Sequence, residues 1–213
     1  MIEAAERLAG QRGLAAMSLR EVQSLAGQKN KSAAQYHFGS REGLIEAVLT
    51  SRMAAVGERR FELLARIDAA VEPTSLRDLV EALVLPVAEH TVAHPTSHWA
   101  RFVAQCTADP DVVAVVQRSV EGASYREVQQ RLAAHLADLP KSIRARRLEH
   151  AIGLAFASLA ATEAVRDAGG SPRLPIAAQI NDLIDVCVGI LAQPSSAATL
   201  AAVRRGRRQE HHP

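Results

Sequence analysis

Hydrophobic residues recur every three or four positions along most of the chain, which is the spacing that places them on one face of an α-helix. The repeats are short in the first fifty residues and longer beyond them. The breaks between the longer segments contain prolines, which end helices there rather than kink them: Pro73, Pro95, Pro110, Pro140 and Pro172. We therefore predict helices over 2–13, 18–27, from 31 or 32 to 37, 41–69, 75–93, 96–107, 111–137, 142–168 and 175–193. The predicted fold class is all-α.

The composition agrees with this pattern. Forty of the 213 residues are alanine, whereas aromatic residues make up only 3%. Alanine has the highest intrinsic helix propensity and contributes little to a sheet. A hydrophobic content of 48% with 23% charged residues excludes a chain that is disordered throughout. The composition thus favours a globular helical protein.

The cysteines and the apolar runs bear on where the protein resides. Cys106 and Cys187 are widely separated and form no CxxC pair, which suits a reducing compartment. The longest apolar run, over 151–162, is shorter than the ~18 residues of a membrane span and is interrupted by Gly153 and Ser158. The N-terminus lacks the basic segment and apolar core of a signal peptide. We expect a cytoplasmic protein without a membrane partner.

The net charge of +2 hides an uneven distribution of charged residues. Residues 1–41 hold six Lys and Arg against three Glu, and residues 204–213 hold four Arg against one Glu. Residues 42–203 hold fifteen basic residues against nineteen acidic ones. Lys29 and Lys31, two of the three lysines of the chain, lie in a stretch without any acidic residue. Such a patch is typical of a surface that binds phosphates, although short basic clusters also occur on ordinary solvated faces.

Two short predicted helices near the N-terminus carry the start and stop signals of a helix-turn-helix unit. Ser18 precedes the first of them and Glu21 follows three residues later, which is the pattern of a capping box. Gly27 ends that helix, and a polar turn leads into the next one. In a helix-turn-helix the second helix of the pair lies in the major groove of DNA. A glutamine there, such as Gln35, can bond adenine, while lysine and arginine bond guanine or phosphate.

These residues also resemble a known family. The first fifty residues contain, in the order seen in the TetR family of bacterial transcriptional repressors, Ser18-Leu19-Arg20-Glu21-Val22, Ala26-Gly27 and Tyr36-His37-Phe38-Gly39-Ser40-Arg41-Glu42-Gly43-Leu44. The resemblance implies a helix-turn-helix DNA-binding domain over 1–46, a helical ligand-binding and dimerisation domain over 47–193, and a basic, flexible tail over 194–213. The turn is one residue longer than the common family pattern, and Gln28 replaces the usual apolar residue after the turn glycine.

The resemblance, together with the chemistry of phosphate and base contacts, points to one set of residues at double-stranded operator DNA. They are Arg20, Lys29, Asn30, Lys31, Ser32, Gln35, Tyr36, His37 and Arg41. The alternative is that some of these side chains pack in the core of the small N-terminal domain or are exposed to solvent without a partner role.

The resemblance further implies an inducer cavity among the middle helices and a two-fold homodimer. An apolar cavity with a few polar groups suits a hydrophobic or amphipathic small molecule. The expected cavity lining is His98, Trp99, Phe102, Gln105, Cys106, Tyr125 and Phe156. Pairing of the last two long helices with their symmetry mates would place at the interface Gly153, Ala157, Ala160, Ala164, Ile180, Leu183, Ile184, Cys187 and Leu191. The alternative for both sets is ordinary core.

We therefore predict a dimeric, ligand-responsive repressor that binds a palindromic operator, without catalytic residues, metal or cofactor. The alternative from a different class is a small helical metal-dependent enzyme. His90, His94 and His98 are spaced four apart and could share one helical face as zinc ligands, although Pro95 interrupts that helix. No GxSxG, P-loop or GxGxxG motif in the sequence supports catalysis.

Overall fold

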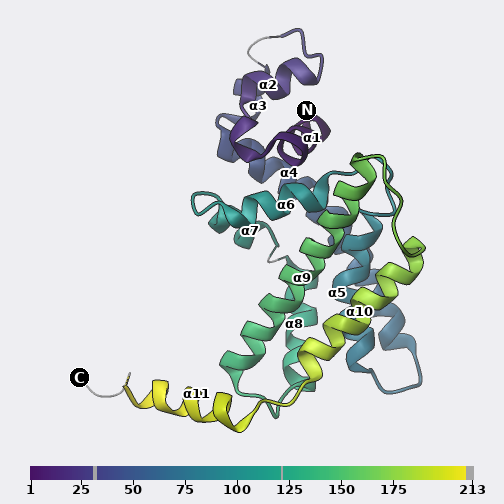
Figure 1. Cartoon of the computed structure of the whole chain (residues 1–213), viewed down its shortest axis with the longest axis vertical. Coiled ribbons are helices and arrows are strands. Elements are labelled where there is room, and N and C mark those ends of the chain that lie inside the picture. Colours follow the sequence, from purple (N-terminus) through teal and green to yellow (C-terminus); the bar gives the residue numbers. More distant parts are fainter. Residues whose placement is uncertain (31–32, 121, 210–213) are drawn as a thin grey trace.

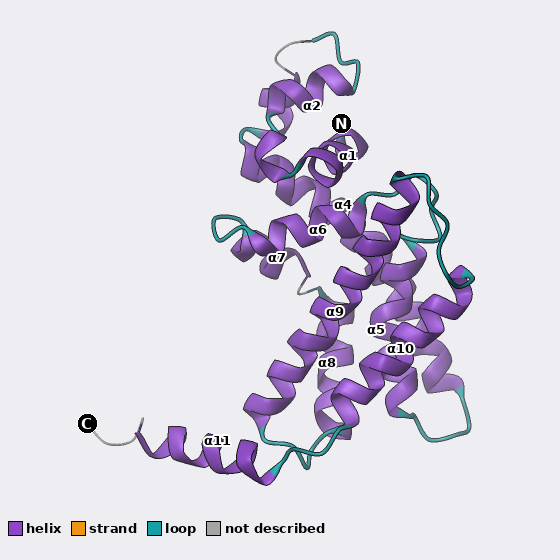
Figure 2. Ribbon diagram, viewed as in Figure 1, coloured by secondary structure: helices purple, strands orange, loops and turns teal. Residues whose placement is uncertain are grey.

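The computed structural model describes residues 1–30, 33–120 and 122–209, and within these ranges it contains helices and no strand. The all-α prediction is confirmed for this part of the chain (Figures 1 and 2). The elements in chain order are α1 (Ile2–Arg12), the 3-10 helix η1 (Leu14–Ala16), α2 (Leu19–Leu25), α3 (Ala33–Phe38), α4 (Arg41–Ala69), α5 (Leu76–Glu89), α6 (Trp99–Ala108), α7 (Val113–Val120), α8 (Ala123–His135), α9 (Lys141–Asp167), α10 (Ile176–Ala192) and α11 (Ala197–Gln209).

Two of the longer predicted helices differ from the structure. The helix predicted over 111–137 is two helices, α7 and α8, and Gly122 stands at the N-cap of the second one. The helix predicted over 75–93 ends at Glu89, and the hydroxyl of Thr91 donates to carbonyl oxygens of its last turn. In both cases a continuous apolar period extends across a break that a single glycine or threonine marks only weakly.

The segment after residue 193, predicted as a tail without periodicity, contains helix α11. The Ser196 side chain accepts a hydrogen bond from the backbone N–H of Thr199 at 3.2 Å, which satisfies a donor of the first helical turn. Alanines follow and favour the helix by propensity. Figure 1 shows α11 leading away from the body of the protein, at the end opposite α1 and α2. Its arginines Arg204 and Arg205 therefore lie far from the N-terminal basic segment of the same protomer.

The described helices enclose two hydrophobic cores that share helix α4. The first core combines α1, η1, α2 and the N-terminal half of α4 with α6 and α7, and it contains Leu44, Trp99 and Phe102. The second core combines the C-terminal half of α4 with α5, α8, α9 and α10, and it contains Leu79 and Ile184. The predicted domain boundary at residue 46 thus lies inside α4, and α6 and α7 complete the core of the N-terminal helices.

Helix α6 packs against both α1 and α9, and a buried carboxylate fixes its start. Glu163 of α9 is fully buried and accepts hydrogen bonds from the backbone N–H groups of Ala100 (3.3 Å) and Arg101 (3.0 Å) and from the Ser97 hydroxyl (2.9 Å). The N–H groups of Ala100 and Arg101 belong to the first turn of α6, where backbone N–H groups have no partner within the helix. Burial raises the pKa of Glu163 in spite of these hydrogen bonds. Helix α9 is thereby tied to the helix that supports the N-terminal domain.

Candidate nucleic-acid interface and ligand cavity

Helix α2 begins at the serine that the capping pattern predicts. The Ser18 side chain accepts a hydrogen bond from the Glu21 backbone N–H at 3.2 Å, and its hydroxyl donates to the Glu21 carboxylate at 2.9 Å. The N-cap role of Ser18 is confirmed, and the Glu21 carboxylate binds the serine hydroxyl rather than following the reciprocal pattern of a capping box. Arg20, in the same first turn, is exposed.

Gly27 ends α2 in the left-handed conformation, with φ of 65°. Its N–H donates to the Ser24 carbonyl at 3.1 Å, and the Gln28 N–H donates to the Gln23 carbonyl at 3.1 Å. This pair of bonds is the Schellman motif, which satisfies the last carbonyl groups of a helix. The Gln23 side-chain amide also donates to the carbonyl oxygen of Asn30, so the turn is held from inside the domain.

A close approach between α3 and α4 depends on Gly43. Ser40 caps α4 by accepting a hydrogen bond from the Gly43 N–H at 3.0 Å. A Cβ atom at Gly43 would lie 2.1 Å from the carbonyl oxygen of Phe38, the last residue of α3. Gly39 between them has a φ of 69°, which favours glycine. Gly39, Ser40 and Gly43 therefore fix the orientation of α3 relative to α4.

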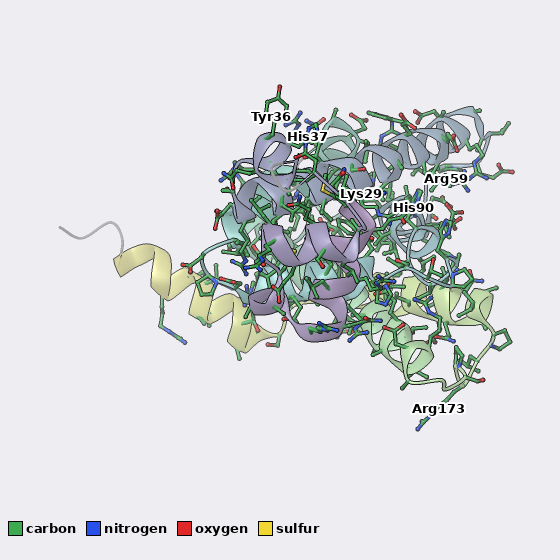
Figure 3. All side chains as sticks on the ribbon, turned by 90° about the horizontal axis from the view of Figure 1, so that it is seen from above. Lys29, Tyr36, His37, Arg59, His90 and Arg173 are labelled. Carbon is green, nitrogen blue, oxygen red and sulfur yellow. The ribbon has the colours of Figure 1, made fainter. Side chains whose placement is uncertain are left out.

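Several residues predicted to contact DNA are exposed on α2, on α3 and on the turn between them. Arg20, Lys29, Asn30, Tyr36 and His37 all present their side chains to solvent. Tyr36 is 86% exposed, and Figure 3 shows it projecting outward beside His37, with the ring centroids 5.4 Å apart. A phenol hydroxyl and a ring N–H are suitable donors to phosphate oxygens. Lys31 and Ser32, also predicted at DNA, lie outside the described residues.

Two further residues predicted at DNA use their polar groups within the protein. The Gln35 amide donates to the carbonyl oxygen of Gly39 at 2.6 Å, so reading a base would require it to leave this bond. The Arg41 guanidinium donates to the carbonyl oxygen of Leu14 at 2.9 Å and lies 3.9 Å from the Asp109 carboxylate. Arg41 thus joins the start of α4 to η1 and to the α6–α7 connection. The guanidinium is thus turned toward the protein, and a contact of Arg41 with DNA stays a prediction.

A small apolar cavity lies in the second core, and Tyr125 and Phe156 are among the residues that line it. The rest of its lining is Met53 and Arg60 of α4, Leu83, Val84 and Val87 of α5, Val120 of α7, and Ile152 and Ala155 of α9. Its volume is about 30 Å³, which holds only one or two water molecules. An open groove of about 590 Å³ adjoins the cavity and shares Met53, Arg60 and Val120 with it.

The other residues predicted to line the cavity lie elsewhere. Trp99, Phe102 and Cys106 are fully buried in the first core, because α6 completes the packing of the N-terminal helices. Gln105 is exposed, and the His98 ring lies between Gln11 (3.2 Å) and a carboxylate of α9. Burial also raises the pKa of Cys106 to about 12, so its thiol is not a nucleophile at neutral pH.

The three histidines of the metalloenzyme alternative do not form one site. Because α5 ends at Glu89, the histidines leave the shared helical face that the alternative requires. The rings of His90 and His94 stack with centroids 6.4 Å apart, and His98 lies 3.0 Å from the carboxylate of Asp167. Within the described ranges no three His, Cys, Asp or Glu side chains are grouped so that they could hold a metal ion.

The residues predicted at the dimer interface divide into two groups. On α9, the small residues Gly153, Ala157 and Ala164 are exposed and Ala160 is half-buried, next to Leu154 and Val165 with 39% and 43% exposure. On α10, the half-buried Ile180 and the buried Leu183, Ile184, Cys187 and Leu191 pack in the second core of the same protomer. The interface prediction for the four buried residues is corrected, because they face α5 and α9 rather than solvent.

Helix α9 is also the one described helix that is long and apolar enough to cross a membrane, and the bent pair α10–α11 passes the same test if counted as one span. Core helices of globular proteins pass this test as well. Only 22% of the most apolar window of α9 is buried within the chain.

Arg60 is the charged residue among the cavity residues that the sequence analysis did not predict. It follows Val56 by four positions and precedes Leu63 and Leu64, so it occupies the apolar face of α4. The sequence pattern could have identified Arg60, because it is a single arginine on an otherwise apolar helical face and arginine is almost never fully buried without a partner.

Comparisons with known proteins agree with this geometry. Residues 1–48 match the family model described as bacterial regulatory proteins, tetR family, and this range contains the helix-turn-helix and its supporting helix. Residues 81–189 match the model described as tetracyclin repressor-like, C-terminal domain, and this range contains most of the second core. The comparison with curated proteins gave no match. The second match alone covers more than half of the chain. The chain belongs to the TetR family and is a DNA-binding transcriptional regulator.

Proposed function

We propose that the protein is a cytoplasmic, homodimeric repressor that binds a palindromic operator and is released when a small hydrophobic or amphipathic molecule enters the second core. The observation that carries this proposal combines two features: an exposed surface on α3 and on the turn after α2, within residues 22–41 that contain no acid, and a separate apolar cavity. The long helix α4 packs against α3 and also lines the cavity. One helix-turn-helix makes few base contacts, and a two-fold dimer doubles them on half-sites about one helical turn of DNA apart.

The contact surface on DNA is proposed to be centred on Tyr36. Its exposed hydroxyl, the neighbouring His37 ring and the Lys29 ammonium group would bind phosphates and set the orientation of α3 in the groove. Arg20 stands in the first turn of α2, where it would extend the same phosphate contacts.

The dimer is proposed to form through the exposed apolar face of α9 with the outer face of α10. On α9 this face contains Gly153, Ala157 and Val165, and on α10 it contains Val186, which is 44% exposed. Small residues allow two helix backbones to approach closely, and burial of the larger ones removes apolar surface from water.

Ligand binding is proposed to reach the DNA-binding helices through residues that touch both cores. Met53 and Phe156 line the cavity and also pack against the first core. Displacing either side chain would therefore move α4 relative to α6, which packs on α1. A ligand changes the affinity for DNA only if it binds the released arrangement more tightly, and such coupling is typically about 1–3 kcal/mol.

The contact surface can be tested with the double variant Lys29→Ala, Tyr36→Phe. We expect weaker binding to duplex DNA with unchanged thermal stability, and a salt dependence that is smaller by about one unit of slope, because the Lys29 cation is lost. The matched control is Arg173→Ala, because Arg173 is exposed on the opposite side of the view in Figure 3. Equal affinity of the double variant and the control at moderate salt would remove Tyr36 and Lys29 from the interface.

A further inference from the structure

Arg60 is a buried arginine whose charge no carboxylate balances within the described residues. Its side chain is at the wall of the cavity and the whole residue is 2% exposed. The guanidinium donates to neutral acceptors only, namely the carbonyl oxygens of Ala82 (3.2 Å) and Leu83 (3.5 Å) and the hydroxyl of Ser124 (3.3 Å). It also lies over the ring of Tyr125, 5.9 Å from the centroid.

The neighbouring arginine of the same helix shows the ordinary arrangement. Arg59 is partly exposed and binds both carboxylate oxygens of Glu89, at 2.8 and 3.0 Å, and also binds Glu62 at 2.9 Å. Two consecutive arginines thus differ sharply: one is paired with acids near the surface, and the other is buried against carbonyl groups at long distances.

A buried cation without a counter-ion is costly, because the apolar surroundings do not replace its hydration. Burial lowers the pKa of Arg60 to about 10, so the guanidinium is still charged at neutral pH. Among the described residues, the positive charge of Arg60 therefore lies against an apolar cavity without a carboxylate partner, and this arrangement opposes folding. Functional sites are where such destabilising arrangements persist.

The other residues that line the cavity determine the chemistry of the rest of the ligand. Leu83, Val84 and Val87 of α5 face Ile152 and Phe156 of α9 across the cavity, so the part of a ligand beyond its charged group must be apolar. Arg60 also lines the adjoining open groove, which gives the guanidinium a path to solvent.

We infer, on the basis of the ligand-responsive function proposed above, that the ligand is an organic carboxylate with a compact apolar body, and that Arg60 binds its carboxylate. A planar guanidinium matches a carboxylate with two parallel hydrogen bonds. The Ser124 hydroxyl is within reach of the same group and can donate to it. One positive charge balances one negative charge, which favours a carboxylate over a doubly charged phosphate ester.

Entry of such a molecule requires the cavity to enlarge. The present volume of about 30 Å³ is far below the 300–1,000 Å³ that is roughly typical of small-molecule sites. Met53 separates the cavity from the groove and is the most adaptable side chain of the wall. Displacement of Met53 would join the cavity and the groove around Arg60. It would also shift α4, whose N-terminal half packs in the first core.

The test measures binding to the full-length protein without DNA, by calorimetry and by thermal unfolding. The probes are butanoate, octanoate and benzoate, with octanol and octyl phosphate as matched compounds that lack or change the charge. The variants are Arg60→Met, which keeps the volume and removes the charge, Arg60→Lys, which keeps the charge, and Arg59→Met as the matched control on the same helix.

We expect at least one carboxylate to bind the wild type and the Arg59→Met control about tenfold or more tightly than its uncharged counterpart. The Arg60→Met variant should lose this preference while its melting temperature stays equal or rises, and Arg60→Lys should keep part of it. Stronger binding of octyl phosphate than of octanoate would assign the site to a phosphate ester and overturn the carboxylate.

Three other results would overturn the inference: binding of no carboxylate, equal binding of octanoate and octanol, or unchanged octanoate binding by Arg60→Met. None of them affects the DNA-binding proposal, which the duplex experiments test separately.

Discussion

Replacement of Glu163 tests the junction between α9 and α6 most sharply. This fully buried carboxylate accepts three hydrogen bonds, and two of the donors are backbone N–H groups at the start of α6. The third donor, the Ser97 hydroxyl, also contacts the carbonyl oxygen of His90 at 3.3 Å and can turn to it. Glu163→Ala therefore leaves two buried N–H groups without an acceptor.

The magnitude follows from the cost of those two groups. A buried donor without an acceptor costs about 1–3 kcal/mol, so two of them cost about 4 kcal/mol. Part of this loss is offset because the variant no longer buries a carboxylate, whose desolvation opposes folding. We expect a net decrease in the free energy of unfolding of about 3 kcal/mol for Glu163→Ala, and about half of that for Glu163→Gln, which keeps one oxygen.

The pH dependence has a definite sign. Burial raises the pKa of folded Glu163 above its ordinary value of 4.5, so the folded state binds the proton more tightly than the unfolded state. The wild type should therefore lose stability relative to Glu163→Gln as the pH rises from about 4.5 through the raised pKa.

Urea unfolding followed by circular dichroism at several pH values measures both effects. The matched control is Glu149→Ala, since Glu149 lies on the same helix with its side chain 61% exposed. A loss for Glu163→Ala no larger than that of the control would refute the capping role. A wild type that gains stability over Glu163→Gln as the pH rises would refute the direction of the pKa shift.

Three further substitutions test other parts of the structure. Gly43→Ala places a Cβ atom 2.1 Å from the Phe38 carbonyl oxygen. We expect the free energy of unfolding to fall by about 2 kcal/mol or more and duplex binding to weaken strongly. Wild-type stability and binding would show that α3 and α4 do not meet as described. Glu6→Gln breaks the bidentate pair, at 2.6 and 2.7 Å, between the buried Glu6 carboxylate and the partly exposed guanidinium of Arg52 on α4. We expect a loss of about 2 kcal/mol in denaturant unfolding, and a change below about 0.5 kcal/mol would mean that the pair is solvated. Ala157→Arg introduces a charge into the exposed face of α9 and should convert dimer to monomer in analytical ultracentrifugation, while Gln117→Arg on the exposed side of α7 should not; a dimeric Ala157→Arg protein would place the interface elsewhere.

The helix-turn-helix was predictable because its signals are local. The Ser18 cap and the Gly27 turn are decided by backbone conformations within a few residues, and both are observed. The direction of a side chain at the domain surface depends on residues that are distant in sequence. Arg41 follows the same motif in sequence, but its guanidinium binds Leu14 and approaches Asp109, a residue that only the tertiary fold brings near.

The cavity was predicted less well, for a related reason. Aromatic residues were expected to line it, and Tyr125 and Phe156 do, whereas Trp99 and Phe102 belong to the other core. Periodicity shows which face of α6 is buried but not which neighbouring helix covers that face. The same limit applies to Cys187 and its neighbours on α10, where the apolar face packs within the protomer and the small-residue face of α9 is left exposed.

The central claim is that the surface around α3 reads DNA as a two-fold dimer, and selection of bound duplexes from a random pool tests it most directly. The wild type should enrich a palindromic consensus with half-sites about one helical turn apart, and its affinity for that consensus should fall steeply with salt. The double variant Lys29→Ala, Tyr36→Phe should enrich the same sequence more weakly. Absence of any enriched sequence, or enrichment of a single half-site that the wild type binds as a monomer, would contradict the account.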